Sequence, residues 1–109
     1  MIKNNHYIRV LLDEEATIVE FECTLLDVTS NYSDMVGKNW FDTFIDVVDK
    51  QEIQKIFYNT IHEKNGKWTT YKNDLQIDSG HRFIDFENEV IMIENKKYIL
   101  CIGTEHIDA

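Results

Sequence analysis

The chain has 109 residues, enough for one hydrophobic core, and 43% of them are hydrophobic, which excludes a wholly disordered chain. Its formal net charge is −9 and Lys and Arg do not cluster with aromatic residues, so we expect no nucleic-acid partner. It has no polybasic segment and no apolar run of bilayer length, so we expect no direct membrane contact.

Two β-rich segments open the chain and are joined by an acidic turn. His6–Leu12 is rich in apolar and β-branched residues, and Ala16–Phe21 alternates between the two faces of a strand. Asp13–Glu15 between them is polar and short, as hairpin turns are. The spacing predicts a β-hairpin.

A helical region is predicted after the hairpin. Apolar spacing indicates short helices over Cys23–Asn31 and Asn39–Ile45, with a single turn over Tyr32–Gly37 between them. The only long helix is predicted over Asp49–Lys64, where Asp49 is the expected N-cap and Glu52 completes a capping box. Its apolar face has helical spacing and consists of Ile53, Ile56, Phe57 and Ile61.

After Gly66 the period of the apolar residues changes from that of a helix to that of a strand. Three strands are predicted, over Lys67–Ile77, His81–Ile93 and Tyr98–Gly103. The turns between them are predicted at Asp78–Gly80 and Asn95–Lys97. This element order predicts an α+β fold, in which the helices pack on one face of a five-stranded antiparallel sheet. We predict the strand order 2-1-5-4-3 and a single domain over residues 1–109.

Three stretches of the chain are distinctive, Leu25–Ile45, Tyr71–Ile93 and Ile102–Asp108, and in this order and spacing they resemble the PAS family. Leu25–Ile45 (LLDVTSNYSDMVGKNWFDTFI) has a Tyr-Ser pair before a short acidic turn and a Gly-Lys-Asn-Trp run. Tyr71–Ile93 resembles two hairpin strands of the family around a polar Gly turn. Ile102–Asp108 (IGTEHID) resembles the family's exit signature, Gly-x-Asp-Ile-Thr. The resemblance covers nearly the whole chain.

The chain departs from the family pattern at two places. His106 stands where the exit signature has Asp, and Asp108 stands where it has Thr. Glu22 takes the position, just after the second strand, at which many members have Asn. In the family, the Asp of the signature often joins the sheet to the outgoing linker. The first departure therefore bears on how the sheet is coupled to a C-terminal linker.

The resemblance implies a role in signalling. PAS domains bind a small ligand or cofactor between sheet and helices, or serve mainly as dimerisation modules, and they regulate effectors such as histidine kinases and diguanylate cyclases. We therefore expect a non-enzymatic sensory and dimerisation module, a fragment of a larger bacterial signalling protein with a C-terminal effector domain. We expect it to form a homodimer. The first residues lack a secretory signal, so we expect a cytoplasmic domain, whose parent protein can still be membrane-anchored.

A different class of protein is the alternative. Small α+β-cone enzymes and ligand-binding proteins of the ketosteroid-isomerase type also pack helices on a curved sheet, around a buried Asp or His base. That fold usually opens with helices, whereas this chain opens with a predicted hairpin. No pairing of a buried carboxylate with a tyrosine is evident either, so the sensory interpretation is preferred.

No cofactor and no metal is expected. Haem-binding members of the family use a His on the long helix, but His62 lies one residue beyond the apolar stripe and near the predicted helix end. Flavin photoreceptors of the family need a Cys in a Gly-x-Asn-Cys pattern, and this chain has Trp40 there. The four His residues are not at metal-ligand spacing, and Cys23 and Cys101 are interpreted as reduced thiols.

The strand His81–Ile93 carries the candidate ligand site. Its alternation places four side chains toward the helices, those of Ile84, Phe86, Asn88 and Val90. The alternate positions, Asp85, Glu87 and Glu89, are predicted to face solvent. The Asn88 amide needs a partner, which is either a ligand or a core group such as a backbone carbonyl, Tyr71 or a water. Asn73 is a second polar candidate, whose facing the pattern leaves open.

Aromatic residues outside this strand are expected to complete the pocket. Trp40, Phe44 and Phe57 come from the predicted helices, and rings of this size dominate both cores and pocket walls. On the last strand, we predict that Ile99 and Cys101 point outward and form an apolar patch. Either another chain or a cap helix is expected to cover that patch.

Overall fold

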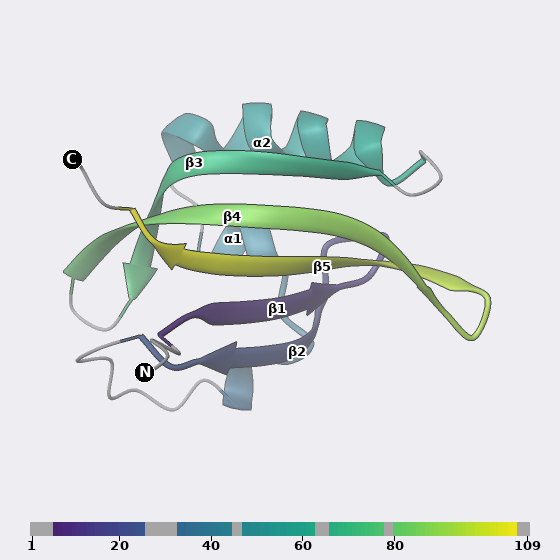
Figure 1. Cartoon of the computed structure of the whole chain (residues 1–109), viewed down its shortest axis with the longest axis horizontal. Coiled ribbons are helices and arrows are strands. Elements are labelled where there is room, and N and C mark those ends of the chain that lie inside the picture. The colour runs from purple at the N-terminus through teal and green to yellow at the C-terminus, as the bar shows by residue number, and fades with distance from the viewer. Residues whose placement is uncertain (1–5, 26–32, 45–46, 63–65, 78–79, 107–109) are drawn as a thin grey trace, which may run out of the picture.

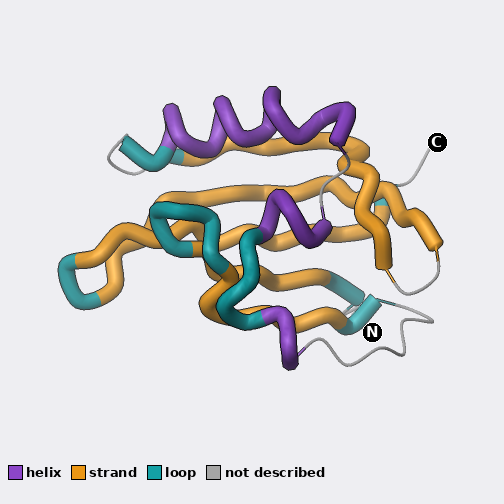
Figure 2. Tube along the Cα trace, turned by 180° about the vertical axis from the view of Figure 1, so that it is seen from behind, coloured by secondary structure: helices purple, strands orange, loops and turns teal. Residues whose placement is uncertain are grey.

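The computed structural model describes residues 6–25, 33–44, 47–62, 66–77 and 80–106. Its strands form one antiparallel sheet in the order β2-β1-β5-β4-β3, which confirms the predicted order. The strands are β1 (Ile8–Leu12), β2 (Ile18–Cys23), β3 (Lys67–Ile77), β4 (Gly80–Ile93) and β5 (Lys96–Glu105). The helices of the described ranges are the 3-10 helix η1 (Ser33–Met35), α1 (Trp40–Phe44) and α2 (Val47–Thr60). Both α-helices lie on the same face of the sheet, the face seen in Figure 2, and the opposite face is turned to the viewer in Figure 1.

The turn of the β1–β2 hairpin is built around Asp13. Its carboxylate accepts hydrogen bonds from the backbone N–H groups of Glu15 and Thr17, both at 2.9 Å. Its backbone carbonyl accepts the N–H of Ala16 at 3.0 Å, and Ala16 adopts a φ of 63° to close the turn. Aspartate favours such turns because its short side chain reaches the backbone two residues ahead. The predicted hairpin is confirmed.

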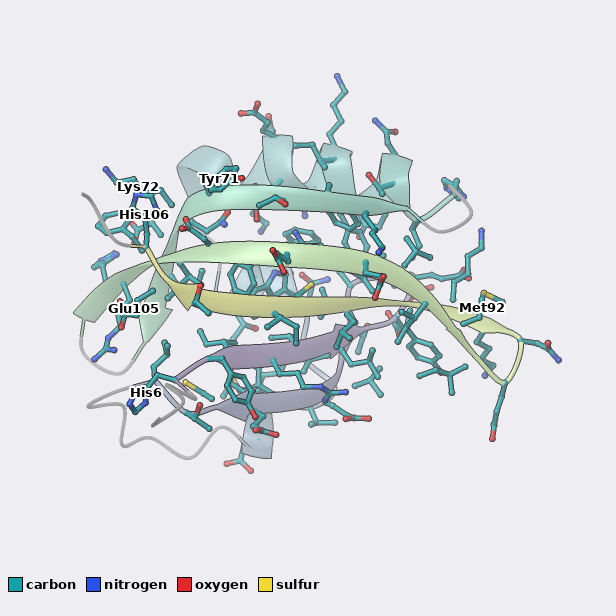
Figure 3. All side chains as sticks on the ribbon, viewed as in Figure 1. His6, Tyr71, Lys72, Met92, Glu105 and His106 are labelled. Carbon is teal, nitrogen blue, oxygen red and sulfur yellow. The ribbon has the colours of Figure 1, made fainter. Side chains whose placement is uncertain are left out.

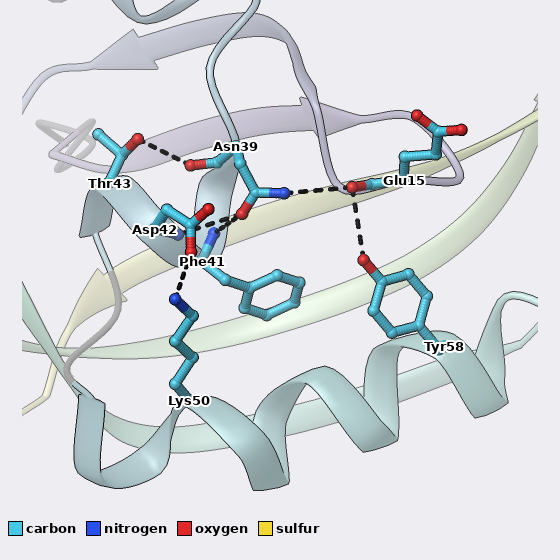
Figure 4. A network of polar contacts seen from close by, with 7 residues as sticks. All are labelled: Glu15, Asn39, Phe41, Asp42, Thr43, Lys50 and Tyr58. Carbon is cyan, nitrogen blue, oxygen red and sulfur yellow. Dashed lines mark hydrogen bonds and ion pairs between the residues drawn. The ribbon is translucent and has the colours of Figure 1, made fainter.

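Helix α1 begins at an N-cap that also anchors the helix to this turn. The side-chain oxygen of Asn39 accepts the N–H groups of Phe41 and Asp42, at 2.9 and 3.1 Å. Its side-chain nitrogen donates to the carbonyl of Glu15 at 3.3 Å. An ion pair between Asp42 and Lys50 then joins α1 to α2 (Figure 4). Asn39 therefore satisfies helix N–H groups that otherwise lack a partner, and it positions the helix against the sheet.

Helix α2 begins at Val47, before the predicted N-cap Asp49, so the predicted capping box with Glu52 is wrong. The predicted start at Asp49 left Val47 and Val48 outside the helix. Valine has a lower helix propensity than most residues because its side chain is β-branched. The cost is only a few tenths of a kcal/mol per valine, which is too small to stop a helix from starting there. The helix ends at Thr60, earlier than predicted, and residues 63–65 lie outside the described ranges.

The segment between β2 and α1 is described from Ser33 onward. The 3-10 helix η1 lies inside the predicted single turn Tyr32–Gly37, and Gly37 has a φ of +92°, which glycine adopts without steric cost. The predicted helix over Cys23–Asn31 falls mainly on residues 26–32, which lie outside the described ranges. Cys23 itself belongs to β2.

The β4–β5 hairpin turns at Glu94 and Asn95, which have φ values of 50° and 67°. Two-residue turns with positive φ at both positions match the twist of the strands that they join. The predicted turn Asn95–Lys97 therefore lies one residue too far along the chain, because Lys96 already pairs with Ile93. Glutamate rarely adopts positive φ, which is why its part in the turn is not visible in the sequence.

Strand β3 contains a bulge between Thr70 and Asn73. Within it Lys72 adopts a φ of 53°, and its N–H donates to the Asp85 carboxylate of β4 at 2.8 Å. Thr70 pairs with Phe86 and Asn73 pairs with Ile84, so both face the helices although they are three positions apart. A bulge shifts the alternation of a strand in this way.

The facing of β5 is the reverse of the prediction. Ile99 and Cys101 are 0% and 5% exposed and lie in the core, opposite Leu12 and Val10 of β1. The side chains that point outward are those of the alternate positions, Tyr98, Leu100 and Ile102, all of them half-buried. Both faces of this strand carry apolar side chains, so alternation alone does not distinguish them.

A single hydrophobic cluster fills the space between the sheet and the helices. It joins Val10 of β1, Phe41 of α1, Phe57 of α2 and Ile84 of β4. None of the helices in the described part of the chain is long and apolar enough to cross a membrane.

Candidate functional site

A small cavity lies within this cluster, between the inner face of the sheet and the two α-helices. Its volume is about 30 Å³, which is room for one or two water molecules. Its wall consists of Leu12, Trp40, Phe41, Ile53, Phe57, Trp68, Thr70, Asn73, Phe86, Asn88 and Cys101. Pockets for drug-sized ligands are about ten or more times larger, so a ligand of that size has to displace wall side chains.

Aromatic rings form the apolar part of the wall. Trp40 packs edge-on against Phe86, with 5.8 Å between ring centroids and an interplanar angle of 88°. Phe41 packs edge-on against Phe57, at 5.4 Å and 83°. Edge-to-face pairs are favourable beyond the area that they bury. Because these pairs connect α1 to β4 and to α2, displacement of one ring moves the contacts between helices and sheet.

Asn73 is the first polar group of the wall. Its side-chain nitrogen donates to Thr70 Oγ1 at 2.9 Å and to the carbonyl of Ile84 at 3.0 Å. Only 7% of the residue is exposed. The sequence left its facing open because the β3 bulge breaks the alternation before it. The hydrogen bond to the Ile84 carbonyl links β3 to β4 at the bulge, where the ladder is irregular.

Asn88 of β4 is the second polar group, and it is also 7% exposed. Its side-chain nitrogen donates to the carbonyl of Trp68 at 3.3 Å. A backbone carbonyl is one of the core partners that the sequence suggested for this amide. The contact does not use the whole hydrogen-bonding capacity of the amide. A role of Asn88 toward a ligand therefore stays a prediction.

Cys101 brings a thiol to the wall from β5. Burial raises the pKa of this thiol to about 12, because a thiolate is not solvated in the core. The thiol is therefore neutral at physiological pH. Cys101 forms no disulfide, and Cys23 on β2 is only half-buried.

The predicted site residues are only partly brought together. Trp40, Phe57, Phe86 and Asn88 belong to the cavity wall. Ile84 and Val90 are buried on the same face of β4 but lie outside the wall. Phe44 ends α1, and its side chain lies outside the described part of the structure. The prediction did not include Thr70 or Cys101, whose facing depends on the bulge and on the ambiguous β5.

A different group of contacts lies where β5 ends. His106 Nδ1 lies 2.7 and 2.9 Å from the two carboxylate oxygens of Asp85, and the His106 N–H donates to the carbonyl of Phe83 at 2.8 Å. The N–H of Lys72 on the bulge lowers the pKa of Asp85, and the hydrogen bond from His106 lowers it further. Figure 3 shows Lys72, His106 and Glu105 together at this end of the sheet. Asp85 thus joins His106, at the end of β5, to the bulge of β3.

The other residues singled out by the sequence lie away from the cavity. His62 is exposed in the turn after α2. Glu22 accepts a hydrogen bond from the Tyr7 hydroxyl on the exposed side of β2, and this bond raises the pKa of Tyr7. No group of three His, Cys, Asp or Glu residues suited to a metal ion occurs among the described residues.

Comparisons with known proteins identify the fold. No protein-family model and no curated protein matches the chain. The PAS domain of the Cronobacter turicensis RpfR quorum-sensing receptor, solved in complex with BDSF, is 16% identical, with a TM-score of 0.67 over 96% of this chain and 98% of that one. The Drosophila melanogaster Cycle PAS-B domain with bound ethylene glycol is 11% identical, with a TM-score of 0.74 over 90% and 98%. The PAS domain of an HTR-like protein from Haloarcula marismortui is 13% identical, with a TM-score of 0.74 over 94% and 83%. The chain therefore has the PAS fold, which its sequence motifs predict.

Proposed function

We propose that the chain is a non-enzymatic sensory input domain. It reports the occupancy of its cavity to an effector domain of the histidine-kinase or diguanylate-cyclase type in a bacterial signalling protein. The observation that carries the proposal is the cavity itself, which lies between the sheet and the helices, with aromatic rings and two carboxamides in its wall. The RpfR structure supports it, because that domain of the same fold belongs to a quorum-sensing receptor and was solved in complex with BDSF.

The chemistry of the wall favours binding over catalysis. Cys101 is the only titratable side chain of the wall within the described ranges, and its pKa of about 12 keeps it protonated at neutral pH. General acid–base catalysis works best with a group whose pKa lies near the working pH, and nucleophilic catalysis by cysteine needs the thiolate. A wall without an ionised side chain suits a ligand that binds and dissociates without being chemically changed.

Strand β5 is the proposed route from the cavity to the effector. Cys101 lies in the wall, and the strand continues from it to Glu105 and then to His106. The Asp85 carboxylate joins His106 to the bulge that holds Asn73, a second wall residue. A ligand that displaces Cys101 or Asn73 therefore shifts the contacts of His106 after the end of β5.

Native mass spectrometry of the freshly purified chain tests the sensory role. We expect a retained small molecule, which is absent after unfolding and refolding in ligand-free buffer. When the molecule is added back, amide hydrogen exchange should slow in β5, which contributes to the wall, and stay unchanged in β2, which does not. The proposal fails if no molecule is retained and no compound of a small-molecule library raises the melting temperature.

A further inference from the structure

The cavity wall carries no charged side chain among the described residues. Its polar groups are the hydroxyl of Thr70, the carboxamides of Asn73 and Asn88, the thiol of Cys101 and the indole N–H groups. The rest of the wall is aliphatic or aromatic.

The hydrogen bonds already made within the wall restrict what it can offer a ligand. Asn73 uses both side-chain hydrogens, toward Thr70 and the Ile84 carbonyl, so it can offer only its carbonyl oxygen. Asn88 uses one hydrogen toward Trp68, so its amide can both donate and accept. The Thr70 hydroxyl can also donate while it accepts from Asn73. Such a wall matches a ligand group that donates and accepts, as a hydroxyl or carboxamide does.

We propose that the ligand is an uncharged molecule with an apolar body and one hydroxyl or carboxamide group. This inference rests on the proposed sensory function and names the chemical class that the same cavity takes. A buried carboxylate or phosphate needs a cation or several converging N–H donors, and a buried ammonium group needs a carboxylate. The described part of the wall carries no charged side chain, so an ion of either sign that enters it is left without a counter-charge. The aromatic rings provide the contact surface for the apolar body.

Four small probes of nearly equal size test this class. Benzyl alcohol has the neutral polar group, toluene lacks it, benzoate carries a negative charge, and benzylamine is protonated at neutral pH. Each is titrated into the 15N-labelled chain, and the side-chain amide signals of Asn73 and Asn88 report binding in the cavity. The Asn59 side-chain amide, on the exposed face of α2, is the internal control for contact elsewhere.

We expect benzyl alcohol to bind most tightly. Toluene should bind about two- to tenfold more weakly, because it leaves the polar part of the wall unpaired. Benzoate and benzylamine should bind at least about tenfold more weakly than benzyl alcohol, because each buries an unpaired charge. The variant Phe57→Leu, which replaces an aromatic ring of the wall with a smaller aliphatic side chain, is titrated in parallel. It enlarges a cavity that is smaller than the probes.

The outcomes separate this inference from the sensory role. If benzoate or benzylamine shifts the two amide signals at the same concentration as benzyl alcohol, the inference is wrong and the sensory role stands. Equal binding of toluene and benzyl alcohol also overturns the inference, because the polar groups then do not contribute. If no probe shifts the cavity signals in either protein, or if the shifts occur only at Asn59, this inference is wrong, and the sensory role is decided separately by native mass spectrometry and the library screen.

Discussion

Two carboxamides hold backbone carbonyls of neighbouring strands inside the core. Asn73 makes two hydrogen bonds, at 2.9 and 3.0 Å, and Asn88 makes one at 3.3 Å. Removal of either amide leaves a buried carbonyl without its donor, which typically costs about 1–3 kcal/mol. The shorter and more numerous bonds of Asn73 place it toward the upper end of that range.

We therefore predict that Asn73→Ala and Asn88→Ala both lower the free energy of unfolding, by about 1–3 kcal/mol each, and Asn73→Ala by more. Urea denaturation followed by circular dichroism measures the loss. Asn59→Ala on the exposed face of α2 is the matched control, and it should change stability by no more than about 0.5 kcal/mol. If Asn73→Ala behaves like the control, the amide does not support the bulge.

Asp85 makes the stability of the domain depend on pH. Its pKa is lowered in the folded chain, first by the Lys72 N–H and then by His106. A carboxyl group with a depressed folded pKa stabilises the protein above its unfolded pKa, and this contribution is lost as the pH falls through the folded pKa. Asp85→Asn should therefore be less stable than wild type at neutral pH, and the difference should shrink below the ordinary pKa of Asp.

Thermal melts of both proteins between neutral pH and about pH 3 test this dependence. Glu87→Gln is the control, because Glu87 lies two positions away on the same face of β4 and is exposed. If the stability difference between Asp85→Asn and wild type stays constant over this range, ionisation of the Asp85 carboxylate does not contribute to stability.

At the scale of the elements, Gly103 shows how closely β5 packs on its neighbour. A Cβ atom at this position lies 2.6 Å from Ile84 Cγ2 and 2.6 Å from Phe86 Cε1, closer than real Cβ contacts. Both contacts belong to buried side chains with little room to retreat. Position 103 of β5 therefore requires glycine, because the inward side chains of Ile84 and Phe86 on β4 occupy the space beside it.

We predict that Gly103→Ala destabilises the domain by about 1–3 kcal/mol through overpacking. Thr104→Ala, at the next and exposed position of the same strand, should have a much smaller effect. Urea denaturation of both variants measures the difference. Equal stability of the two would mean that Phe86 and Ile84 move aside without cost.

The elements also show which parts of the site can be predicted from a sequence. Along β4 the alternation is unbroken, and the predicted inward facing of Phe86 and Asn88 is confirmed by their burial. The bulge of β3 inserts residues into the ladder, so the inward facing of Asn73 cannot be counted from its neighbours. β5 is apolar on both faces, and its facing is set by its pairing with Val10 and Leu12 of β1. The facing of Asn73 and the facing of β5 are both decided by pairing with another strand, and this pairing leaves no pattern within the strand itself.

At the scale of the whole molecule, none of the described helices covers the sheet face that is turned to the viewer in Figure 1. Tyr98, Leu100 and Ile102 form its apolar row, in place of the predicted Ile99 and Cys101. Leu11 lies opposite Leu100 on this face and is only 3% exposed, although it is not part of the main core cluster. This row offers a surface for pairing with a second copy.

Charges limit how that pairing can occur. Glu20 lies opposite Leu11, and Glu89 lies opposite Leu100, so carboxylates border the row on both sides. Arg9 pairs with Glu20 at 2.9 Å and Lys67 with Glu89 at 3.2 Å, but both ion pairs are exposed and contribute little. Two copies with a net charge of −9 each repel one another, and salt screens this repulsion.

We propose a homodimer through this face that strengthens with salt, and we predict that Leu100→Glu prevents it. Sedimentation equilibrium of the chain at about 0.05 M and about 0.5 M NaCl should show tighter association at the higher concentration, where the Debye length is shorter. Leu100→Glu puts a charge in the centre of the apolar row and should stay monomeric at both. Val36→Glu, at a 53% exposed position outside the sheet, is the control and should associate as wild type does. Because salt also strengthens apolar association, the control must keep the same salt dependence for the assignment to this face to hold. If wild type and Leu100→Glu sediment alike, the dimer does not use this surface.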